Sequence, residues 1–443
     1  MTLEELKKKR VSAISLGCDK NRVDLEKMLY NLQYFGFEIV DDAENAEIVI
    51  VNTCAFIKPA IDEAVQNIIL ATDFKNNICE KVIVTGCLPA RFSNEMDKID
   101  GVDAILNIKD NQKIVETVLG LYGIDGQVDY KDGRVLSNLP HYAYLKIADG
   151  CNNGCAYCTI PRIRGRYRSV PIENLIKEAK TLADMGVKEI ILIAQDITRY
   201  GEDLYDEIKL VDLIKQISKI KSIKWIRLHY CYPELVTDEL LEEINKNQKV
   251  CKYLDIPLQH IDDKILKDMN RRTTEEQIRQ LFDKLNSRYP NIAVRSTFIV
   301  GFPGETKKQF KKLLNFLTEA KISHAGFFAY SREEKTKAYF MKKQVWNITK
   351  KHRLKKAQKA QEQIMNAINI NKIGGIYDTI IDYYDEENSY YIGRFQEDSP
   401  EVDFNVLIED GKNLQVGEIY KVKVTDYTDS VFIGEVTQDE STK

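Results

Sequence analysis

The stretch DGCNNGCAYCTIPRIRG, from Asp149 to Gly165, places Cys151, Cys155 and Cys158 in the pattern C-x3-C-x2-C. A structural zinc site needs four ligands, and no fourth cysteine or histidine lies nearby in the sequence. A 4Fe–4S cluster takes one thiolate per iron, so three cysteines leave one iron open to a substrate or cofactor. The spacing therefore predicts an iron–sulfur cluster with an open coordination position.

Strands alternate with helices around this stretch, from about residue 140 to about residue 345. The six strand candidates are YLKIAD, EIILIAQD, IKWIRLHY, KYLDIPL, VRSTFIVG and HAGFFAY. Helical patterns such as PIENLIKEAKTLADMG separate them. Six such βα units predict an α/β fold with a partial (β/α)6 barrel of the TIM type, whose chemistry lies at the carboxyl ends of the strands.

Three further cysteines end strands in the N-terminal part of the chain. VSAISLGC, EIVIVNTC and KVIVTGC close on Cys18, Cys54 and Cys87, which are 36 and 33 residues apart. Intervening helical patterns predict a parallel α/β sheet, whose strands share one carboxyl edge. The three thiols are therefore expected to be neighbours in space. The alternative is that each is an ordinary buried cysteine.

The segment from about residue 374 contains five short β-rich runs and no helical pattern, which predicts a small antiparallel β-barrel. Residues 374–443 contain seventeen Asp or Glu and five Lys or Arg. Such a surface would repel the phosphates of tRNA and attract a basic protein. Five acidic residues at the start of the barrel are predicted to attract such a basic protein: Asp378, Asp382, Asp385, Glu386 and Glu387.

The chain thus divides into three segments, with predicted domains at residues 10–125, 138–370 and 374–440. No segment approaches eighteen uninterrupted apolar residues, and no signal peptide is evident, which predicts a cytoplasmic protein that does not contact membranes. Nine cysteines in such a chain favour metal ligation over disulfides. A basic helical run, ITKKHRLKKAQKAQEQIMNAINI, is interpreted as the solvated face of a linker.

The motif C-x3-C-x-aromatic-C, with Tyr157 before the last cysteine, resembles the radical S-adenosylmethionine superfamily. FIVGFPGET, from Phe298 to Thr306, is similar to a glycine-bearing strand end of that superfamily. The resemblance implies that S-adenosylmethionine binds the open iron and is cleaved to a 5′-deoxyadenosyl radical. The residues that the resemblance assigns to cofactor binding are Tyr157, Gln195, Asp196, Arg295, Gly301 and Glu305.

Almost the whole chain resembles the methylthiotransferases, in which a TRAM domain follows the radical barrel. SLGCDKNRVD, NTCAFI, VTGC, LDIPLQH and GFPGET occur in the expected order. The resemblance implies that Cys18, Cys54 and Cys87 hold a second 4Fe–4S cluster, and that one S-adenosylmethionine supplies the radical and another the methyl group.

The stretch AQDITRYGEDLY, from Ala194 to Tyr205, separates two branches of the family. The tRNA branch, of the MiaB type, has a sequence similar to GQNVNSY there and modifies an adenosine next to the anticodon. This chain is similar to the RimO branch, which adds a methylthio group to the β-carbon of an aspartate in the twelfth protein of the small ribosomal subunit. The implied partners are that ribosomal protein, free or in the ribosome, and a flavodoxin- or ferredoxin-like electron donor.

Two other classes of protein fit the sequence less well. An electron carrier would saturate its irons with protein ligands, so two incomplete cysteine sets favour catalysis. An RNA-binding module would be expected to carry a basic C-terminal barrel.

Some residues keep two interpretations. Four arginines, at positions 162, 164, 166 and 168, form either a solvated loop or a partner for a carboxylate. His260 is expected to line the cavity without binding a metal. Three further cysteines are expected to be buried and structural: Cys79, Cys231 and Cys251.

Overall fold

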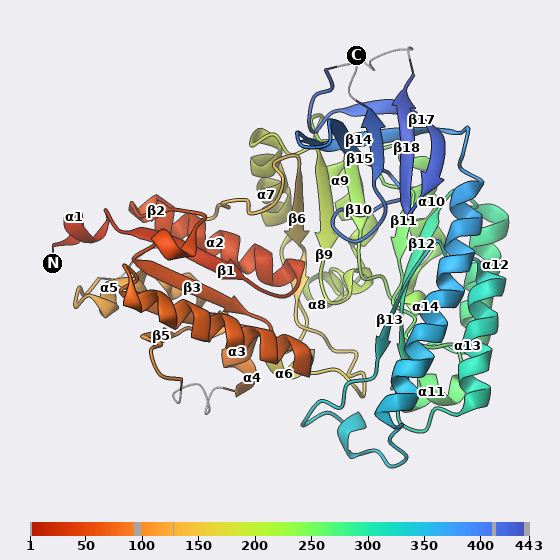
Figure 1. Cartoon of the computed structure of the whole chain (residues 1–443), viewed down its shortest axis with the longest axis horizontal. Helices are drawn as coiled ribbons and strands as arrows, with labels where there is room; N and C mark the ends of the chain where they lie inside the picture. Colours follow the sequence, from red (N-terminus) through yellow and green to blue (C-terminus); the bar gives the residue numbers. More distant parts are fainter. Residues whose placement is uncertain (1, 93–98, 127, 410–412, 438–443) are drawn as a thin grey trace. The chain divides into compact units, whose positions relative to one another are not determined.

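The computed structural model describes residues 2–92, 99–126, 128–409 and 413–437. Figure 1 labels its helices and strands, coloured along the sequence. Its contacts divide the chain into two compact units. Unit 1 contains residues 1–137, 149–168 and 333–336, and unit 2 contains residues 138–148, 169–332 and 337–443. The C-x3-C-x2-C loop therefore groups with the N-terminal segment, and the C-terminal segment groups with the barrel. The division into three domains stays a prediction from the sequence.

Unit 1 is built on a parallel sheet with the order β2-β1-β3-β4-β5. Its strands are β1 (Arg10–Ser15), β2 (Glu38–Ile39), β3 (Ile48–Thr53), β4 (Lys81–Gly86) and β5 (Ala104–Ile105). Its helices are α1 (Leu3–Leu6), α2 (Asp19–Phe35), α3 (Lys58–Asp73), α4 (Cys87–Phe92), α5 (Ile114–Leu121) and α6 (Ile160–Ile163). All six residues of β3 are buried, as expected for a central strand covered on both faces.

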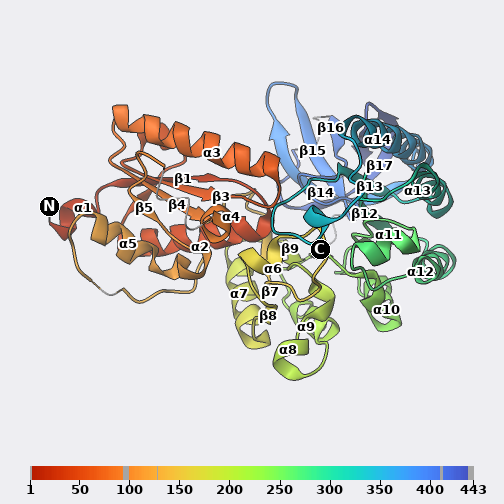
Figure 2. The ribbon, with the colours of Figure 1, turned by 90° about the horizontal axis from the view of Figure 1, so that it is seen from below.

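Helices cover the two faces of this sheet. One core packs residues of α2 and α5 against it, and the other packs residues of α3 (Figure 2). The N-terminal parallel α/β fold predicted from the sequence is confirmed.

Unit 2 contains the barrel strands, all parallel and in two sheets of three. The strands are β6 (Tyr142–Lys146), β9 (Glu189–Ile193), β10 (Trp225–Leu228), β11 (Tyr253–Asp255), β12 (Ala293–Val300) and β13 (His324–Ala329). The sheets have the orders β10-β9-β6 and β11-β12-β13. A parallel bridge between Ile226 and Val250 joins them. All six predicted strands are present, and together they form a partial barrel.

Helices follow the barrel strands and close the βα units. They are α7 (Ile172–Asp184), α8 (Glu202–Tyr205), α9 (Leu210–Ile217), α10 (Asp238–Lys246), α11 (Asp263–Asp268), α12 (Glu275–Arg288), α13 (Lys307–Ala320) and α14 (Asn347–Ile370). A two-stranded sheet, β7 (Ala148–Asp149) with β8 (Arg168–Ser169), flanks the C-x3-C-x2-C loop. None of the helices described here is long and apolar enough to cross a membrane.

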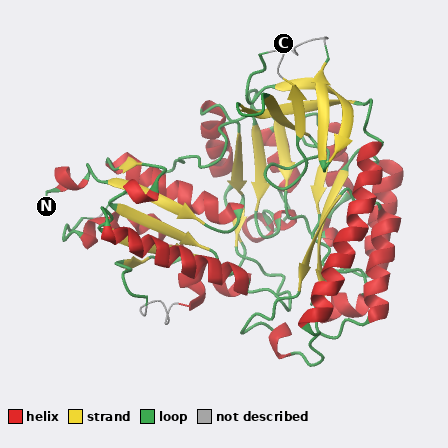
Figure 3. Cartoon of the chain, viewed as in Figure 1, coloured by secondary structure: helices red, strands yellow, loops and turns green. Residues whose placement is uncertain are grey.

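The C-terminal segment is a closed five-stranded barrel with the order β14-β15-β16-β18-β17 (Figure 3). Its strands are β14 (Ile376–Asp385), β15 (Tyr390–Phe395), β16 (Val406–Glu409), β17 (Ile419–Thr428) and β18 (Val431–Val436). The predicted barrel is confirmed, with one departure: β16 pairs with β18 in parallel, and the other pairs are antiparallel.

Buried ion pairs join this small barrel to the amino ends of the parallel strands. Glu189, the first residue of β9, lies 2.5 Å from Arg394 of β15 and 2.7 Å from Arg227 of β10. All three side chains are fully buried. Burial alone would raise the pKa of Glu189, but the two guanidinium groups outweigh it and lower the pKa to about 2.

The loop between β15 and β16 continues this contact. Arg227 donates to the backbone oxygen of Gln396 at 2.8 Å, and Arg295 pairs with Asp403. His324 lies 3.0 Å from the backbone oxygen of Glu397. Residues 396–403 therefore cover the amino ends of several barrel strands, and this explains why the two barrels form one compact unit.

The structure corrects one part of the predicted acidic surface. Asp382 is 5% exposed, lies 3.0 Å from Arg394 and accepts a contact from His141 at 2.7 Å. The negative charge of Asp382 is neutralised by Arg394 within unit 2. Asp382 therefore cannot attract a basic protein from the surface. The four residues of β14 from Thr379 to Asp382 are all buried, and the register of the strand shifts between Ile381 and Tyr383, which a count of acidic residues could not reveal.

Candidate functional site

Cys18, Cys54 and Cys87 lie at the carboxyl ends of three adjacent strands in the unit 1 sheet. Cys18 precedes α2 directly after β1, Cys54 follows β3, and Cys87 begins α4 after β4. Each of the three thiols is close enough to influence the others electrostatically. The expectation that a parallel sheet would bring them together is therefore met.

Glycines with left-handed backbone angles precede four of the cysteines. Gly17 has φ 99°, Gly86 has φ 92°, Gly150 has φ 80° and Gly154 has φ 64°. A Cβ on Gly17 would lie 2.8 Å from Cβ of Cys54, and one on Gly86 would lie 2.5 Å from a backbone oxygen. Only glycine fits these turns, so the Gly–Cys pairs fix where the thiols point. The repeated dipeptide was a signal in the sequence that our reading missed.

The strand-end thiols lie beside a buried arginine. Arg164 is 2% exposed, and its Nη1 lies 3.0 Å from a carboxylate oxygen of Asp24 and 3.0 Å from one of Asp149. Burial raises the pKa of the Cys87 thiol to about 12, although the nearby positive charge of Arg164 opposes the shift. Sequence reasoning did not single out Asp24 or Asn21, which also contacts Arg164 at 3.4 Å.

The C-x3-C-x2-C loop holds its cysteines with backbone contacts. The Cys151 amide donates to the Gly165 oxygen at 3.2 Å and closes the loop at its base. Backbone amides donate to the sulfurs of Cys151 and Cys158, each at 3.4 Å. Donors of this kind favour a thiolate over a thiol.

A pocket of about 420 Å³ opens on this loop. Its lining residues are Cys151, Asn152, Gly154, Pro161, Gly165 and Arg166. The loop thus combines thiol ligands with space beside them, as an open coordination position requires.

The donor sets fit iron–sulfur clusters better than single metal ions. Among the residues that the structure describes, no group of three or more His, Cys, Asp or Glu side chains is placed to hold one metal ion. The thiolates of a 4Fe–4S cube each bind a different iron, so they stand further apart than the ligands of one ion. The strand-end thiols lie close enough to influence one another electrostatically, and the loop thiols share one stretch of eight residues.

The four arginines of the loop have different environments. Arg164 is buried in the ion pairs above, Arg162 donates to the backbone oxygen of Lys335 at 2.7 Å, and Arg166 lines the pocket. Arg168 lies in β8 and is exposed. Neither interpretation made for the group as a whole therefore applies to all four.

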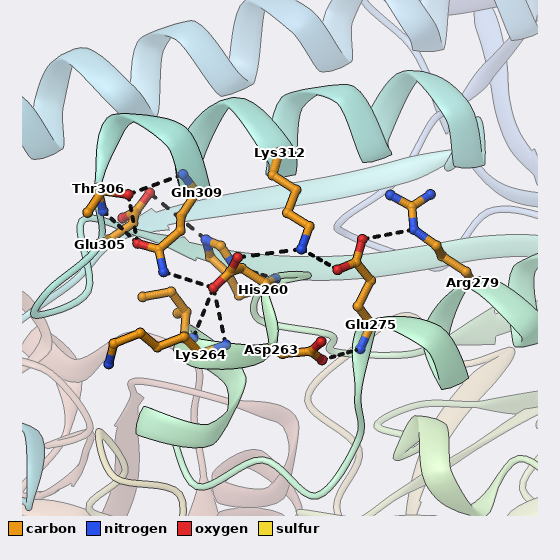
Figure 4. A network of polar contacts seen from close by, with 11 residues as sticks. His260, Asp263, Lys264, Glu275, Arg279, Glu305, Thr306, Gln309 and Lys312 are labelled. Carbon is orange, nitrogen blue, oxygen red and sulfur yellow. Dashed lines mark hydrogen bonds and ion pairs between the residues drawn. The ribbon is translucent and has the colours of Figure 1, made fainter.

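In unit 2, polar side chains join the loops that follow β11 and β12 (Figure 4). Asp262 accepts from the backbone amides of Lys264 and Ile265 and from Gln309 Nε2 at 2.8 Å. Gln309 in turn accepts from Thr306, the residue that caps α13. These contacts hold the two strand-end loops in one arrangement.

Glu305 anchors the GFPGET turn from the inside. Its carboxylate accepts from the Gly301 amide and lies 3.2 Å from Arg353 of α14. Its second oxygen lies 4.0 Å from Nε2 of His260, and both side chains are fully buried (Figure 4). His260 Nδ1 accepts from the Asp262 amide at 3.0 Å, so the ring proton lies on Nε2 and faces Glu305.

The other residues assigned to S-adenosylmethionine divide between the two ends of the strands. Gln195 and Asp196 follow β9 at its carboxyl end, and Gly301 follows β12, where its φ is 74°. Asp196 is buried and accepts from the Thr198 amide at 3.1 Å, which caps a short helical turn. Tyr157 is half-buried in the cysteine loop.

Arg295 differs from these residues. It is the third residue of β12, near the amino end of the strand, and its guanidinium pairs with Asp403 of the C-terminal barrel.

Three cysteines outside both sets are buried, as expected: Cys79, Cys231 and Cys251.

Family models match three parts of the chain. Residues 10–107 match the uncharacterized protein family UPF0004, residues 145–317 match the radical SAM superfamily, and residues 373–437 match the TRAM domain. The three matches follow the order of the N-terminal sheet, the partial barrel and the five-stranded barrel.

Relatives resemble the chain over nearly its full length. A protein from Clostridium botulinum (strain Eklund 17B / Type B), named ribosomal protein uS12 methylthiotransferase RimO, is 46% identical over 98% of this chain and 100% of its own. Proteins of the same name from Acetivibrio thermocellus and Clostridium tetani are 43% and 41% identical, each over 98% of this chain.

A solved structure shares the fold. It is the radical S-adenosylmethionine methyltransferase TsrM from Kitasatospora setae, with cobalamin and a [4Fe-4S] cluster bound. The TM-score is 0.57 and the identity 14%, over 75% of this chain and 77% of that one. At this identity the match supports the fold alone.

Proposed function

The chain belongs to the RimO family of methylthiotransferases, and from that membership we propose that it transfers a methylthio group to the ribosomal protein uS12. It is a radical S-adenosylmethionine enzyme that uses 4Fe–4S clusters and S-adenosylmethionine. The observation that carries the proposal is the pair of three-cysteine sets, one at the ends of three strands and one in a single loop. The acceptor atom within uS12 is the β-carbon of an aspartate.

Cys151, Cys155 and Cys158 hold one cluster, and Cys18, Cys54 and Cys87 hold the other. When bound, the loop cluster supplies the electron that cleaves S-adenosylmethionine, and the strand-end cluster supplies an iron at which sulfur is added. The protein contributes fixed thiols: glycine turns direct Cys18, Cys87 and Cys151, and amides donate to the sulfurs in the loop.

Residues at the carboxyl ends of the barrel strands contact S-adenosylmethionine in this proposal: Gln195, Asp196 and Gly301, with Tyr157 beside the loop cluster. Glu305 acts indirectly, because its carboxylate is already engaged by Gly301 and Arg353. Arg295 is left out, since its charge is neutralised by Asp403 at the other end of the strand.

The partners of the enzyme extend the proposal. The electron donor is a flavodoxin- or ferredoxin-like protein, because each turnover needs single electrons. The tRNA branch is the alternative that the relatives do not favour, since those listed above are named for uS12.

Mass spectrometry tests the proposal. The chain is reconstituted anaerobically with iron and sulfide, then incubated with S-adenosylmethionine, a reductant, and either uS12 or bulk tRNA. A methylthio adduct on an aspartate of uS12, with none on tRNA, is the expected result. An adduct on tRNA and none on uS12 would overturn it.

A further inference from the structure

A basic, aromatic surface runs from the loop after β13 onto α14. Residues 337–361 contain eight lysines and one arginine and no aspartate or glutamate. The structure separates these charges into two groups. Lys350 donates to the backbone oxygen of Tyr330 at 2.9 Å, and Arg353 pairs with Glu305, so both are buried and structural. The other seven lysines are exposed: Lys337, Lys342, Lys343, Lys351, Lys355, Lys356 and Lys359.

The exposed lysines of α14 form one face of the helix. Ala357 and Gln361 lie on the buried side, and Gln361 donates to the backbone oxygen of Ile322 at 2.8 Å. Lys351, Lys355 and Lys359 are spaced four residues apart, so they line up on the opposite side. Within the described residues, none of the seven lysines has an acidic partner. A face made only to be solvated usually mixes both signs of charge.

Large apolar side chains stand beside these lysines in the open. Trp346 and Ile348 are each 80% exposed, and Phe340 is 73% exposed. The loop that carries Phe340 is held by its own contacts: Gln344 donates to the backbone oxygens of Ala338 and Met341, each at 3.0 Å. Phe340 and Trp346 are therefore presented on fixed backbone with most of their surface exposed, and the ring of Tyr339 meets Phe340 edge-on.

The loop lies at the carboxyl end of a barrel strand. The Gly304 amide, in the turn after β12, donates to the Lys343 oxygen at 2.9 Å. The basic, aromatic surface thus begins next to the turn that we assign to S-adenosylmethionine and extends along the outside of α14.

We propose that residues 337–359 bind RNA with unpaired bases, the lysines contacting phosphates and Phe340 and Trp346 stacking on bases. Lysines with interleaved exposed aromatics are the chemistry that recognises single-stranded nucleic acid. A free ribosomal protein is itself basic and would be repelled by seven uncompensated lysines, but the rRNA around it would be attracted. The identity of this RNA as rRNA rests on the proposed function. If that function holds, the enzyme binds uS12 within a ribosomal particle.

Binding is measured on the full, reconstituted chain by fluorescence anisotropy. The probe is a labelled single-stranded RNA of mixed sequence, about 20 nucleotides long, titrated over a range of salt. Each phosphate contact on a single strand contributes about 0.7 to the slope of log affinity against log salt. The triple variant Lys351→Gln, Lys355→Gln, Lys359→Gln is expected to lower that slope by about 2 and to weaken binding at low salt by at least about tenfold.

A matched triple variant removes the same charge elsewhere. Lys219, Lys221 and Lys224 are exposed and lie before β10, at the amino end of a strand. Changing these three to glutamine is expected to leave affinity and slope unchanged. Trp346→Leu keeps an apolar side chain but no aromatic face, so it should weaken RNA binding about tenfold if a base stacks there.

Equal losses of RNA affinity in the two triple variants, or unchanged RNA binding in Trp346→Leu, would overturn the proposal. Anionic vesicles and RNA-free uS12 are tested as ligands in the same way. The proposal is also overturned if the α14 variant loses binding to either of them and keeps its binding to RNA. Modification of a short uS12 peptide keeps this test separate from the proposed function. The α14 variant should modify the peptide as the parent does and modify uS12 in small subunits several-fold less. If the parent binds RNA but modifies neither substrate, the proposed function fails and the RNA site stands.

Discussion

The two ends of the barrel strands in unit 2 differ in what their charged residues do. At the amino ends, Glu189 is buried between Arg227 and Arg394, and these ion pairs link the strands to the small barrel. At the carboxyl ends, the carboxylates of Asp196 and Glu305 accept hydrogen bonds from backbone amides in the turns that follow β9 and β12. The charges at one end join two barrels, and those at the other end shape the turns where barrels of this kind place their chemistry.

The largest expected effect is on catalysis, through the loop that follows the first barrel strand. Changing Cys151, Cys155 and Cys158 to alanine should reduce S-adenosylmethionine cleavage to background. Bound iron should fall from about eight atoms per chain to about four, since each cube holds four. Iron analysis and quantification of 5′-deoxyadenosine check this. Cys231→Ala, at a buried cysteine outside both sets, is the control and should retain all the iron.

At the amino end the expected loss is in stability. Glu189→Gln leaves two guanidinium groups buried with one partner fewer, which should lower the free energy of unfolding by about 3–5 kcal/mol. Denaturant titration measures it. Glu239→Gln is the control, because its contact with Lys215 at 3.5 Å is exposed and should matter by less than about 1 kcal/mol. If Glu189→Gln abolished cleavage per folded molecule, the two ends would not be separable.

Asp398 makes the amino end sensitive to pH. Burial raises the pKa of its carboxyl to about 6, against the opposing charges of Lys372 and His324 and alongside Asp403 and Glu397. Because the folded pKa lies above the unfolded one, the contribution to stability is present below about pH 4 and is lost as pH rises through about 6. Asp398→Asn should flatten the stability profile across that window, by up to about 3 kcal/mol. An unchanged profile would show that Asp398 is ionised with its neighbours throughout.

The smallest expected effect sharpens the account of the carboxyl end. Glu305→Gln can still accept from the Gly301 amide but loses its charge opposite Arg353. We expect a loss of about 1–2 kcal/mol in unfolding free energy and a several-fold higher KM for S-adenosylmethionine. Cleavage assays over a range of cofactor concentration measure it. A lower kcat at unchanged KM would indicate that Glu305 touches the reacting atoms instead.

Much of the carboxyl end could be predicted from the sequence, because its residues follow strands directly. The alternation of strands and helices predicts the six strands of the partial barrel. In the unit 1 sheet, the meeting of Cys18, Cys54 and Cys87 is predicted in the same way, because parallel strands share an edge. The Arg164 environment was not predictable, since its partner Asp24 is 140 residues away in sequence.

The contacts at the amino ends of the barrel strands could not be predicted, because their partners are far apart in sequence. His141 meets Asp382 across 241 residues, and Arg227 meets Gln396 across 169. A count of acidic residues treats Asp382 as a surface residue, although it ends a run of four buried residues in β14. The family resemblance assigned Arg295 to the cofactor, but its position near the start of β12 gives it a different partner, Asp403.

The glycine turns before Cys18, Cys87 and Cys151 bear on the order in which the enzyme matures. A Cβ at Gly17, Gly86 or Gly150 would lie within 2.8 Å of neighbouring chain, so these turns require glycine for a reason that does not involve a cluster. We therefore expect the turns to form as the chain folds, before iron is loaded. Amide hydrogen exchange at these turns should then be as slow before iron is supplied as afterwards.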